Sequence, residues 1–272
     1  MIDTCIDLLN KTKENKPLVH HITNYVTAND CANVTLEIGA SPIMADDIEE
    51  VLEITAVSDS VVINTGTLNC KTLKSMFLSG KMANKKNIPV IFDPVGVGAT
   101  RFRNDAVMKF IKEVNASVVR GNISEIKFIA GVDSKIKGVD AFESYFVDIE
   151  HTKKIAKEIA QELNCVVAIS GAVDVISNGN KIICIKNGHS SLRGLTGTGC
   201  MCSSLIGSLC GATKNQNFEA TITAMLCMGI AGELAHKNTK NLGNGSFHIA
   251  IHNSISTMNG KIFKEMARFY EE

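Results

Sequence analysis

The sequence has no excess of charge of either sign. Its 272 residues include 28 lysines and arginines and 28 aspartates and glutamates, so its formal net charge at pH 7 is zero. Nucleic-acid-binding proteins depend on cationic side chains that neutralise phosphates, and we therefore expect no nucleic-acid partner. The composition is 45% hydrophobic, and no compositional repeat is present, which also excludes a disordered or fibrous chain. Small molecules are the expected partners.

Long apolar runs are missing as well. The most apolar stretch, residues 224–232, is far shorter than the roughly 20 residues of a membrane-spanning helix, so it predicts a buried helix and no membrane partner. Asp3 and Asp7 stand near the start of the chain, where a signal peptide would be basic and then apolar. We expect a cytoplasmic protein.

The nine cysteines form no recognisable metal or disulfide pattern. No two of them make a C-x-x-C pair, and Cys200 and Cys202 lack a second pair of ligands at zinc spacing. An odd number of cysteines in a long chain is not typical of a disulfide framework. We expect most of these thiols to be buried and reduced, and a redox or metal protein is a distant alternative.

Short runs of β-forming residues alternate with longer segments of helical periodicity, which predicts a mostly parallel central sheet flanked by helices. No proline-rich or low-complexity linker divides the chain, so we expect a single α/β domain over residues 1–272. The predicted strands are 18–22, 41–44, 60–64, 89–94, 117–120 and 166–170, followed by an antiparallel hairpin of 174–177 and 182–185. The predicted helices are 27–38, 47–56, 71–84, 104–114, 152–163, 199–209, 218–236, 246–258 and 262–270, so the C-terminal third is mainly helical.

The segment TGTGC at residues 196–200 leads directly into an apolar helix. Glycines at such a place let backbone amides converge on an anion, and a helix N-terminus adds partial positive charge. The segment is neither a Walker A motif nor a dinucleotide fingerprint, since Cys202 occupies the third glycine position. An anion site and a simple helix-starting turn are equally compatible with it.

Cys200 lies at the start of this helix, where the helix dipole favours the thiolate over the thiol. It could act as a nucleophile, as a general base or as a polar contact to a substrate hydroxyl. A buried structural cysteine is the alternative for any one of nine. Its position distinguishes Cys200 from the other eight.

Three charged residues stand near the ends of neighbouring predicted strands. Asp93 and Glu125 could hold Mg²⁺ next to the phosphates of a nucleotide, although each carboxylate could also be an ordinary turn or first-turn helix residue. Arg120 ends an otherwise apolar run and needs an anionic partner. That partner is either a triphosphate or an internal carboxylate.

Two pairs of histidines are weaker candidates. His20 and His21 lie at the end of a predicted strand with no third ligand at a recognisable spacing, which favours pocket lining or a core position over a metal site. His248 and His252 share a helix face but lack the intervening glutamate of a metalloprotease. The sequence favours a surface or packing role for this second pair.

Taken together, the polar segments resemble those of the hydroxyethylthiazole kinase family, and the resemblance covers essentially the whole chain in order and spacing. The segments are ITNYV at 22–26, GASPIMA at 39–45, DPVGVGAT at 93–100, RGN at 120–122 with Glu125, and TGTGC at 196–200. The resemblance implies a ribokinase-like fold. It also implies transfer of the γ-phosphoryl group of ATP to the primary alcohol of 4-methyl-5-(2-hydroxyethyl)thiazole in thiamine biosynthesis.

The resemblance implies roles for eight residues. Substrate contacts would be Asn24, Met44 and Gly197; ATP contacts would be Arg120 and Ser170; Asp93 and Glu125 would be associated with Mg²⁺; and Cys200 would be the catalytic residue, at the position where sugar kinases of the wider superfamily have an aspartate. The resemblance further implies a homotrimer. His21 departs from it, because relatives often have a smaller polar residue there, and a His21 facing the pocket could change the pH dependence.

Two other functions remain open at the level of sequence. A kinase for the pyrimidine alcohol of thiamine biosynthesis shares the fold and chemistry, although Asn24 and Met44 favour the thiazole. A non-catalytic sensor of ATP or a thiamine precursor is the alternative of a different class. The presence of the full set, Asp93, Glu125, Arg120 and Cys200, argues against loss of catalysis.

Overall fold

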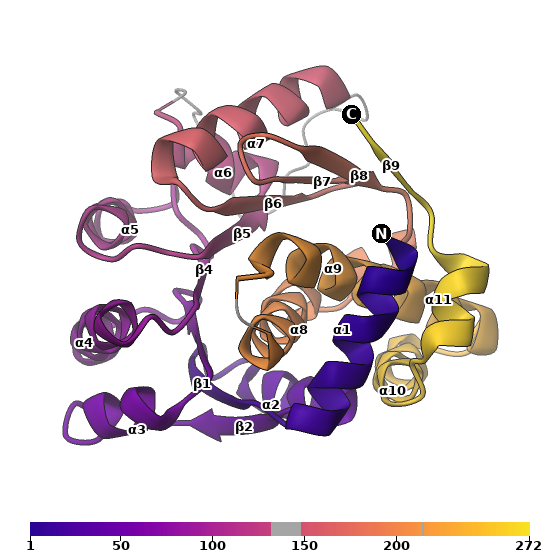
Figure 1. Ribbon diagram of the computed structural model, residues 1–272, viewed down its shortest axis with the longest axis horizontal. Coiled ribbons are helices and arrows are strands. Elements are labelled where there is room, and N and C mark those ends of the chain that lie inside the picture. Colours follow the sequence, from indigo (N-terminus) through magenta and orange to yellow (C-terminus); the bar gives the residue numbers. More distant parts are fainter. Residues whose placement is uncertain (132–147, 214) are drawn as a thin grey trace.

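A nine-stranded sheet runs through the computed structural model, which describes residues 1–131, 148–213 and 215–272 (Figure 1). Its strand order is β2-β1-β3-β4-β5-β6-β7-β8-β9. Pairing is parallel from β2 through β6 and antiparallel from β6 to β9. The strands are β1 (Leu18–Ile22), β2 (Ser41–Met44), β3 (Ser60–Asn64), β4 (Val90–Asp93), β5 (Val118–Asn122), β6 (Val166–Ser170), β7 (Asp174–Ser177), β8 (Ile182–Ile185) and β9 (Phe269–Glu271).

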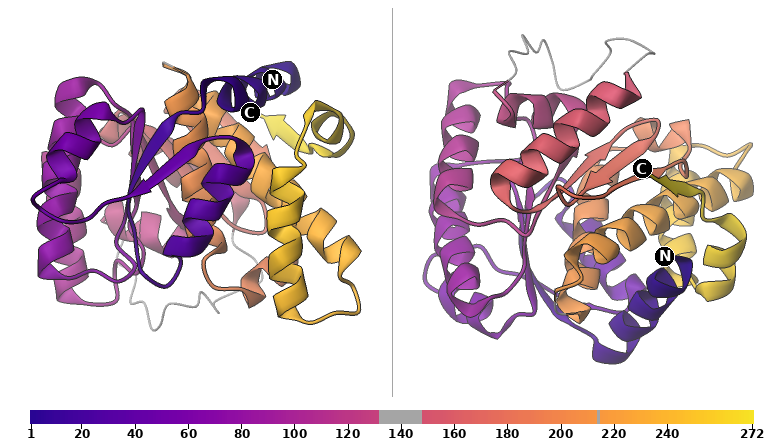
Figure 2. Two further views of the ribbon diagram at one scale, coloured as in Figure 1. Left: turned by 90° about the horizontal axis from the view of Figure 1, so that it is seen from below. Right: turned by 45° about the horizontal axis from the view of Figure 1, so that its top comes forward.

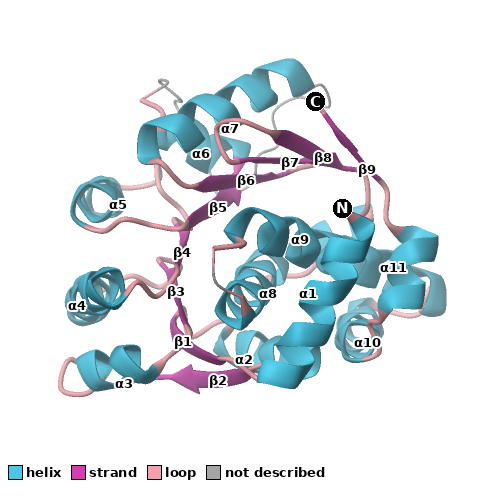
Figure 3. Cartoon of the chain, viewed as in Figure 1, coloured by secondary structure: helices cyan, strands magenta, loops and turns pink. Residues whose placement is uncertain are grey.

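Helices cover both faces of this sheet (Figures 2 and 3). On one face lie α3 (Val51–Val57), α4 (Cys70–Lys86), α5 (Arg101–Glu113), α6 (Ile123–Ile129) and α7 (Ile149–Leu163). On the other lie α1 (Ile2–Asn15), α2 (Ala28–Ile38), α8 (Thr198–Ala212), α9 (Asn217–Asn238), α10 (Asn244–Ser256) and α11 (Gly260–Met266), with a 3₁₀ turn at Ser190–Gly194. The predicted α/β fold with a helical C-terminal third is confirmed.

The strands supply two separate cores because alternate side chains point to opposite faces. Val62 packs in the core under α8 and α9, whereas its neighbours Val61 and Ile63 pack under α4. In the same way, Val118 belongs to the core under α8 and α9, and Val119 belongs to the core on the opposite face of the sheet. Burial on both faces explains why these strands read as continuous apolar runs.

One helix, α9, is long and apolar enough to cross a membrane by length and composition alone. In the fold, however, 83% of its most apolar window is buried, where it packs against α8 and α10. The buried helix predicted at residues 224–232 is thus confirmed as part of the core.

The helix predicted at residues 262–270 differs from the structure. Residues 262–270 do not form one helix: α11 ends at Met266, and Phe269 begins the edge strand β9. The backbone amide of Arg268 donates to the side chain of Asn187 at 2.7 Å, and the Arg268 carbonyl accepts from the amide of Lys186 at 2.8 Å. These bonds to the two residues that follow β8, together with the pairing of β9 with β8, outweigh the local helical periodicity. The helices α1 and α6 were not predicted.

His20 and His21 lie inside strand β1 as core imidazoles. His21 is 1% exposed, and its Nδ1 donates to the Val19 carbonyl at 3.1 Å. Burial lowers the pKa of His21 to about 4, so this side chain stays neutral at physiological pH. Of the two roles that the sequence favoured, pocket lining and a core position, the structure shows the core position for His21.

We predict that His21 makes the fold sensitive to acid. A histidine with a depressed pKa stabilises the fold above its unfolded pKa of about 6.5, and this contribution is lost as the pH falls toward 4. Between pH 7 and pH 5 the loss is about 2 kcal/mol. Urea unfolding should therefore show that His21→Asn loses about that much less stability over this interval than the wild type. The exposed His151, changed to Asn, is the control, and an equal loss in wild type and His21→Asn would contradict the prediction.

Candidate functional site

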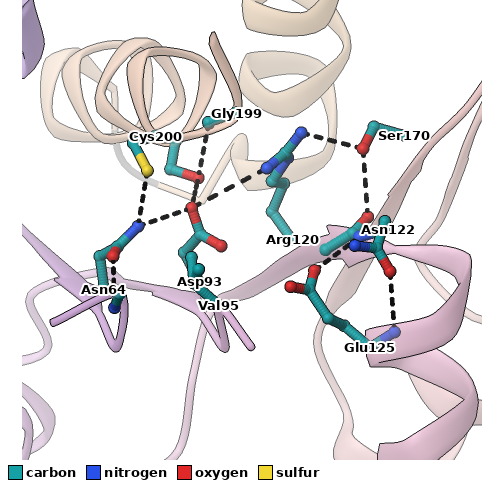
Figure 4. A network of polar contacts seen from close by, with 12 residues as sticks. Asn64, Asp93, Val95, Arg120, Asn122, Glu125, Ser170, Gly199 and Cys200 are labelled. Carbon is teal, nitrogen blue, oxygen red and sulfur yellow. Dashed lines mark hydrogen bonds and ion pairs between the residues drawn. The ribbon is translucent and has the colours of Figure 1, made fainter. Parts of the chain in front are cut away.

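The carboxyl ends of the parallel strands lie side by side beneath the first turn of α8. Side chains at or near these ends form one polar network (Figure 4). Asn64 ends β3, Asp93 ends β4, Ser170 ends β6, and Arg120 lies in the middle of β5. Asn24 follows β1 by two residues. Sequence reasoning chose four of these five side chains as site residues, all but Asn64, and the structure brings all five together.

Asn64 is the centre of the network. Its Nδ2 donates to Asp93 Oδ2 at 3.0 Å and to Cys200 Sγ at 3.2 Å. Its Oδ1 accepts from Asn24 Nδ2 at 3.0 Å and from the amide of Gly66 at 2.9 Å. Asn24 Nδ2 also donates to Cys200 Sγ, at 3.3 Å. One buried amide therefore fixes two strand ends and the start of α8.

Asp93 is fully buried, and only one of its two oxygens is well satisfied. Oδ2 accepts from Ser203 Oγ at 2.7 Å and from Asn64, and it lies 3.9 Å from a guanidinium nitrogen of Arg120. Oδ1 has no hydrogen-bond partner in the described part of the chain. Burial raises the pKa of Asp93 despite the opposing charge of Arg120, which indicates that its negative charge is incompletely compensated.

Arg120 lies between Asp93 and Ser170 in the network. One terminal nitrogen donates to Ser170 Oγ at 2.9 Å, the other faces Asp93, and Nε is buried without a partner in the described residues. The guanidinium lies directly against the backbone of Gly199, where a Cβ would overlap its NH1 nitrogen. A glycine at this position lets the arginine reach the first turn of α8.

Glu125 connects the loop after β4 to the start of α6. It forms a capping box with Asn122: its Oε2 accepts from the Asn122 amide at 2.8 Å, and its own amide donates to Asn122 Oδ1 at 2.9 Å. Its Oε1 accepts from the amide of Gly96 at 3.0 Å. Burial and the nearby charge of Asp93 raise the pKa of Glu125.

Gly197 forms the N-cap of α8 with a φ of 89°, a left-handed conformation that favours glycine. A Cβ there would also lie 2.6 Å from the methyl carbon of Thr27. The first-turn amides of a helix have no partner within the helix, and with the helix dipole they favour an anion at this end. The backbone at residues 197–200 therefore has the form that the anion-site interpretation requires.

Cys200 is held as a thiol. Burial, followed by the negative charge of Asp93, raises its pKa. This direction is opposite to the effect of the helix dipole alone, because burial disfavours the charged thiolate. Two amide groups donate to the sulfur, from Asn24 and Asn64, so its position is tightly fixed.

Met44 lies outside the network. It ends the edge strand β2, beside His21 of β1, and is 40% exposed. Strand order places it two strands from Asn64 at the same edge of the sheet. It can border a molecule bound at that edge but contributes no hydrogen bond of its side chain to the network.

Two members of the network were not chosen from the sequence. Asn64 is the last residue of the strand predicted at 60–64, and its position at a strand end matches that of Asp93. Ser203 lies three residues after Cys200, on the same side of α8, and this helical spacing could have suggested it.

A comparison with known families identifies the chain. The model of the hydroxyethylthiazole kinase family matches residues 9–261. The chain belongs to this family. It is 53% identical to the hydroxyethylthiazole kinase of Ruminiclostridium cellulolyticum over 97% of this chain and 96% of that one. It is 51% identical to that of Clostridium beijerinckii over 97% and 96%.

Solved structures agree with the family assignment. The hydroxyethylthiazole kinase protein of Pyrococcus horikoshii superposes with a TM-score of 0.90 at 35% identity, over 99% of both chains. The pyridoxal kinase of Staphylococcus aureus in complex with pyridoxal gives a TM-score of 0.66 at 16% identity, over 94% of this chain and 98% of that one. The second likeness shows the shared fold alone. The ribokinase-like fold expected from the sequence is confirmed.

We predict that Asn64→Ala lowers kinase turnover by on the order of 100-fold, because a small displacement of reacting groups has effects of that size. The variant removes one donor each from Asp93 and Cys200. Asn84, near the C-terminal end of α4, is the control. Its side-chain amide makes two hydrogen bonds, both with the backbone of Asn115 and neither with a residue of the network. Steady-state kinetics of both variants test this, and equal turnover of Asn64→Ala and Asn84→Ala would contradict it.

Proposed function

We propose that this chain transfers the γ-phosphoryl group of ATP to the primary alcohol of 4-methyl-5-(2-hydroxyethyl)thiazole, in the biosynthesis and salvage of thiamine. The observation that carries the proposal is the network beneath α8. There, a helix N-terminus faces a half-buried arginine, a buried acid and a fixed thiol. Membership of the hydroxyethylthiazole kinase family supports the choice of substrates.

The chain's own groups account for both sides of the reaction. Arg120 and Ser170 would bind the phosphates of ATP, and Arg120 would counter the charge on the group in transfer. The first-turn amides at residues 197–200 would stabilise the same charge, because they are oriented before the reaction begins. Asn24, Met44 and Gly197 would border the thiazole.

Phosphoryl transfer requires positioning and charge stabilisation more than covalent participation by the protein. The alcohol oxygen forms a bond to the γ-phosphorus, the bond from that phosphorus to the bridging oxygen of ADP breaks, and the hydroxyl proton is released. Cys200, a thiol with a raised pKa, is suited to orient the hydroxyl. It is poorly suited to act as a general base. A loose transition state places little demand on a base.

A divalent cation fits the acidic side of the network. Asp93 Oδ1 is buried without a partner in the described residues, and burial raises the pKa of both Asp93 and Glu125. Both features indicate a need for positive charge, and oxygen donors suit Mg²⁺. We propose that Asp93 and Glu125 would hold Mg²⁺ directly or through its waters, where it would neutralise phosphate charge.

We also propose a homotrimer in the cytoplasm. Tyr25 is 82% exposed and Val26 56% exposed beside Asn24, so apolar side chains border the site as they would at a subunit contact. All nine cysteines are free and most are buried, which supports a reducing compartment.

The decisive experiment measures release of ADP with ATP, Mg²⁺ and hydroxyethylthiazole, with the pyrimidine alcohol and a no-acceptor sample in parallel. We expect turnover that depends on the thiazole and disappears when the metal is chelated. Turnover with the pyrimidine alone would replace the proposed substrate. Stabilisation by the thiazole without any ADP would instead favour the sensor.

A further inference from the structure

A second group of charged side chains lies between helices α2 and α10, which pack side by side (Figure 1). Asp30 stands in the first turn of α2, and His248 and His252 stand one turn apart on α10. Asp30 Oδ1 lies 3.2 Å from His248 Nε2 and 3.6 Å from His252 Nε2. Three potential ligand atoms therefore converge within 4.8 Å of one another.

The hydrogen bonds around this cluster leave it short of positive charge. His252 Nδ1 lies 3.0 Å from both oxygens of Glu37, so this nitrogen carries a proton and donates it to the carboxylate. In a neutral imidazole the lone pair is then on Nε2, facing Asp30. His248 Nε2 is buried and has no hydrogen-bond partner in the described part of the chain. In this neutral form, the facing lone pairs repel one another unless a proton or a metal ion lies between them.

We propose that Asp30, His248 and His252 bind one divalent transition-metal ion of the zinc class. Tetrahedral ligand atoms at the usual bond lengths of about 2.0–2.1 Å lie about 3.3 Å apart, and the two measured distances, 3.2 and 3.6 Å, bracket that value. Two imidazoles and one carboxylate are typical ligands for such ions. This proposal replaces the surface or packing role that the sequence favoured for the two histidines.

Glu37 would act in the outer shell of this site. A metal-bound histidine usually donates its other ring N–H to a carboxylate, which fixes the tautomer and orients the ring. The pair of 3.0 Å contacts between His252 Nδ1 and Glu37 has this form. The site is also chemically distinct from the acidic pair of the kinase network, because Mg²⁺ prefers oxygen ligands alone.

The ion would join two helices that flank the loop before α8. The second oxygen of Asp30 lies beside Gly197, whose Cβ would be 3.8 Å from it. At the other end, Asn244 in the first turn of α10 donates to the Gly194 carbonyl at 3.2 Å. Binding would therefore hold α2 and α10 together and stiffen the segment that leads to the proposed substrate site.

The test is calorimetric titration of Zn²⁺ into full-length protein freed of metal by a chelator. It is done at pH 8, because the hydrogen bond to Glu37 raises the pKa of His252 and protons compete with the metal. We expect one Zn²⁺ per chain and a rise in Tm on binding. His248→Gln and His252→Gln should each weaken binding by more than 100-fold, and Glu37→Gln by about 10–100-fold.

The exposed His151 on α7 is the matched control, and His151→Gln should bind Zn²⁺ as the wild type does. Circular dichroism of the metal-free variants establishes that each is folded. Absence of Zn²⁺ binding in the wild type would overturn the proposal, as would an affinity that both cluster variants retain. Either outcome would leave the proposed kinase function standing, because that proposal rests on other residues.

Discussion

The carboxylate of Asp93 is buried in the middle of the sheet edge, and its neighbours are arranged around its charge. Taking an ionised carboxylate out of water costs several kcal/mol unless hydrogen bonds and opposite charges compensate. Its Oδ2 accepts hydrogen bonds from Ser203 and Asn64 and lies near the guanidinium of Arg120, whereas its Oδ1 has no partner among the described residues. The fold therefore leaves the negative charge of this carboxylate incompletely compensated. A cation bound together with a phosphate group would complete the compensation.

Close approach of backbone and side chains is the second constraint on the site. The first turn of α8 lies over Arg120 only because residue 199 is a glycine, and it reaches Thr27 only because residue 197 is one. These contacts bring the first turn of α8 close to the strand ends. The same segment would therefore provide the amides for the phosphoryl group and the thiol for the alcohol.

Much of the fold was predictable, because buried parallel strands read as apolar runs and their ends carry the polar residues. The hydrogen-bond centre at Asn64 was not, since its partners come from segments far apart in the sequence. The raised pKa of Cys200 could not be predicted from the sequence, because burial depends on the whole fold, while the helix dipole is visible locally. Strand β9 was missed for a related reason: its pairing with β8 outweighs helical periodicity. The relation of Asp30 to the two histidines likewise depends on how α2 packs against α10.

We propose that Asp93 helps to hold the metal ion of a metal-bound nucleotide, directly or through its waters. The most direct measurement is calorimetric binding of a non-hydrolysable ATP analogue to the wild type and to Asp93→Asn, each with and without Mg²⁺. The account predicts that Mg²⁺ tightens binding to the wild type and that this effect is lost in Asp93→Asn, while both proteins bind the metal-free analogue. The same dependence on Mg²⁺ in both proteins would contradict it.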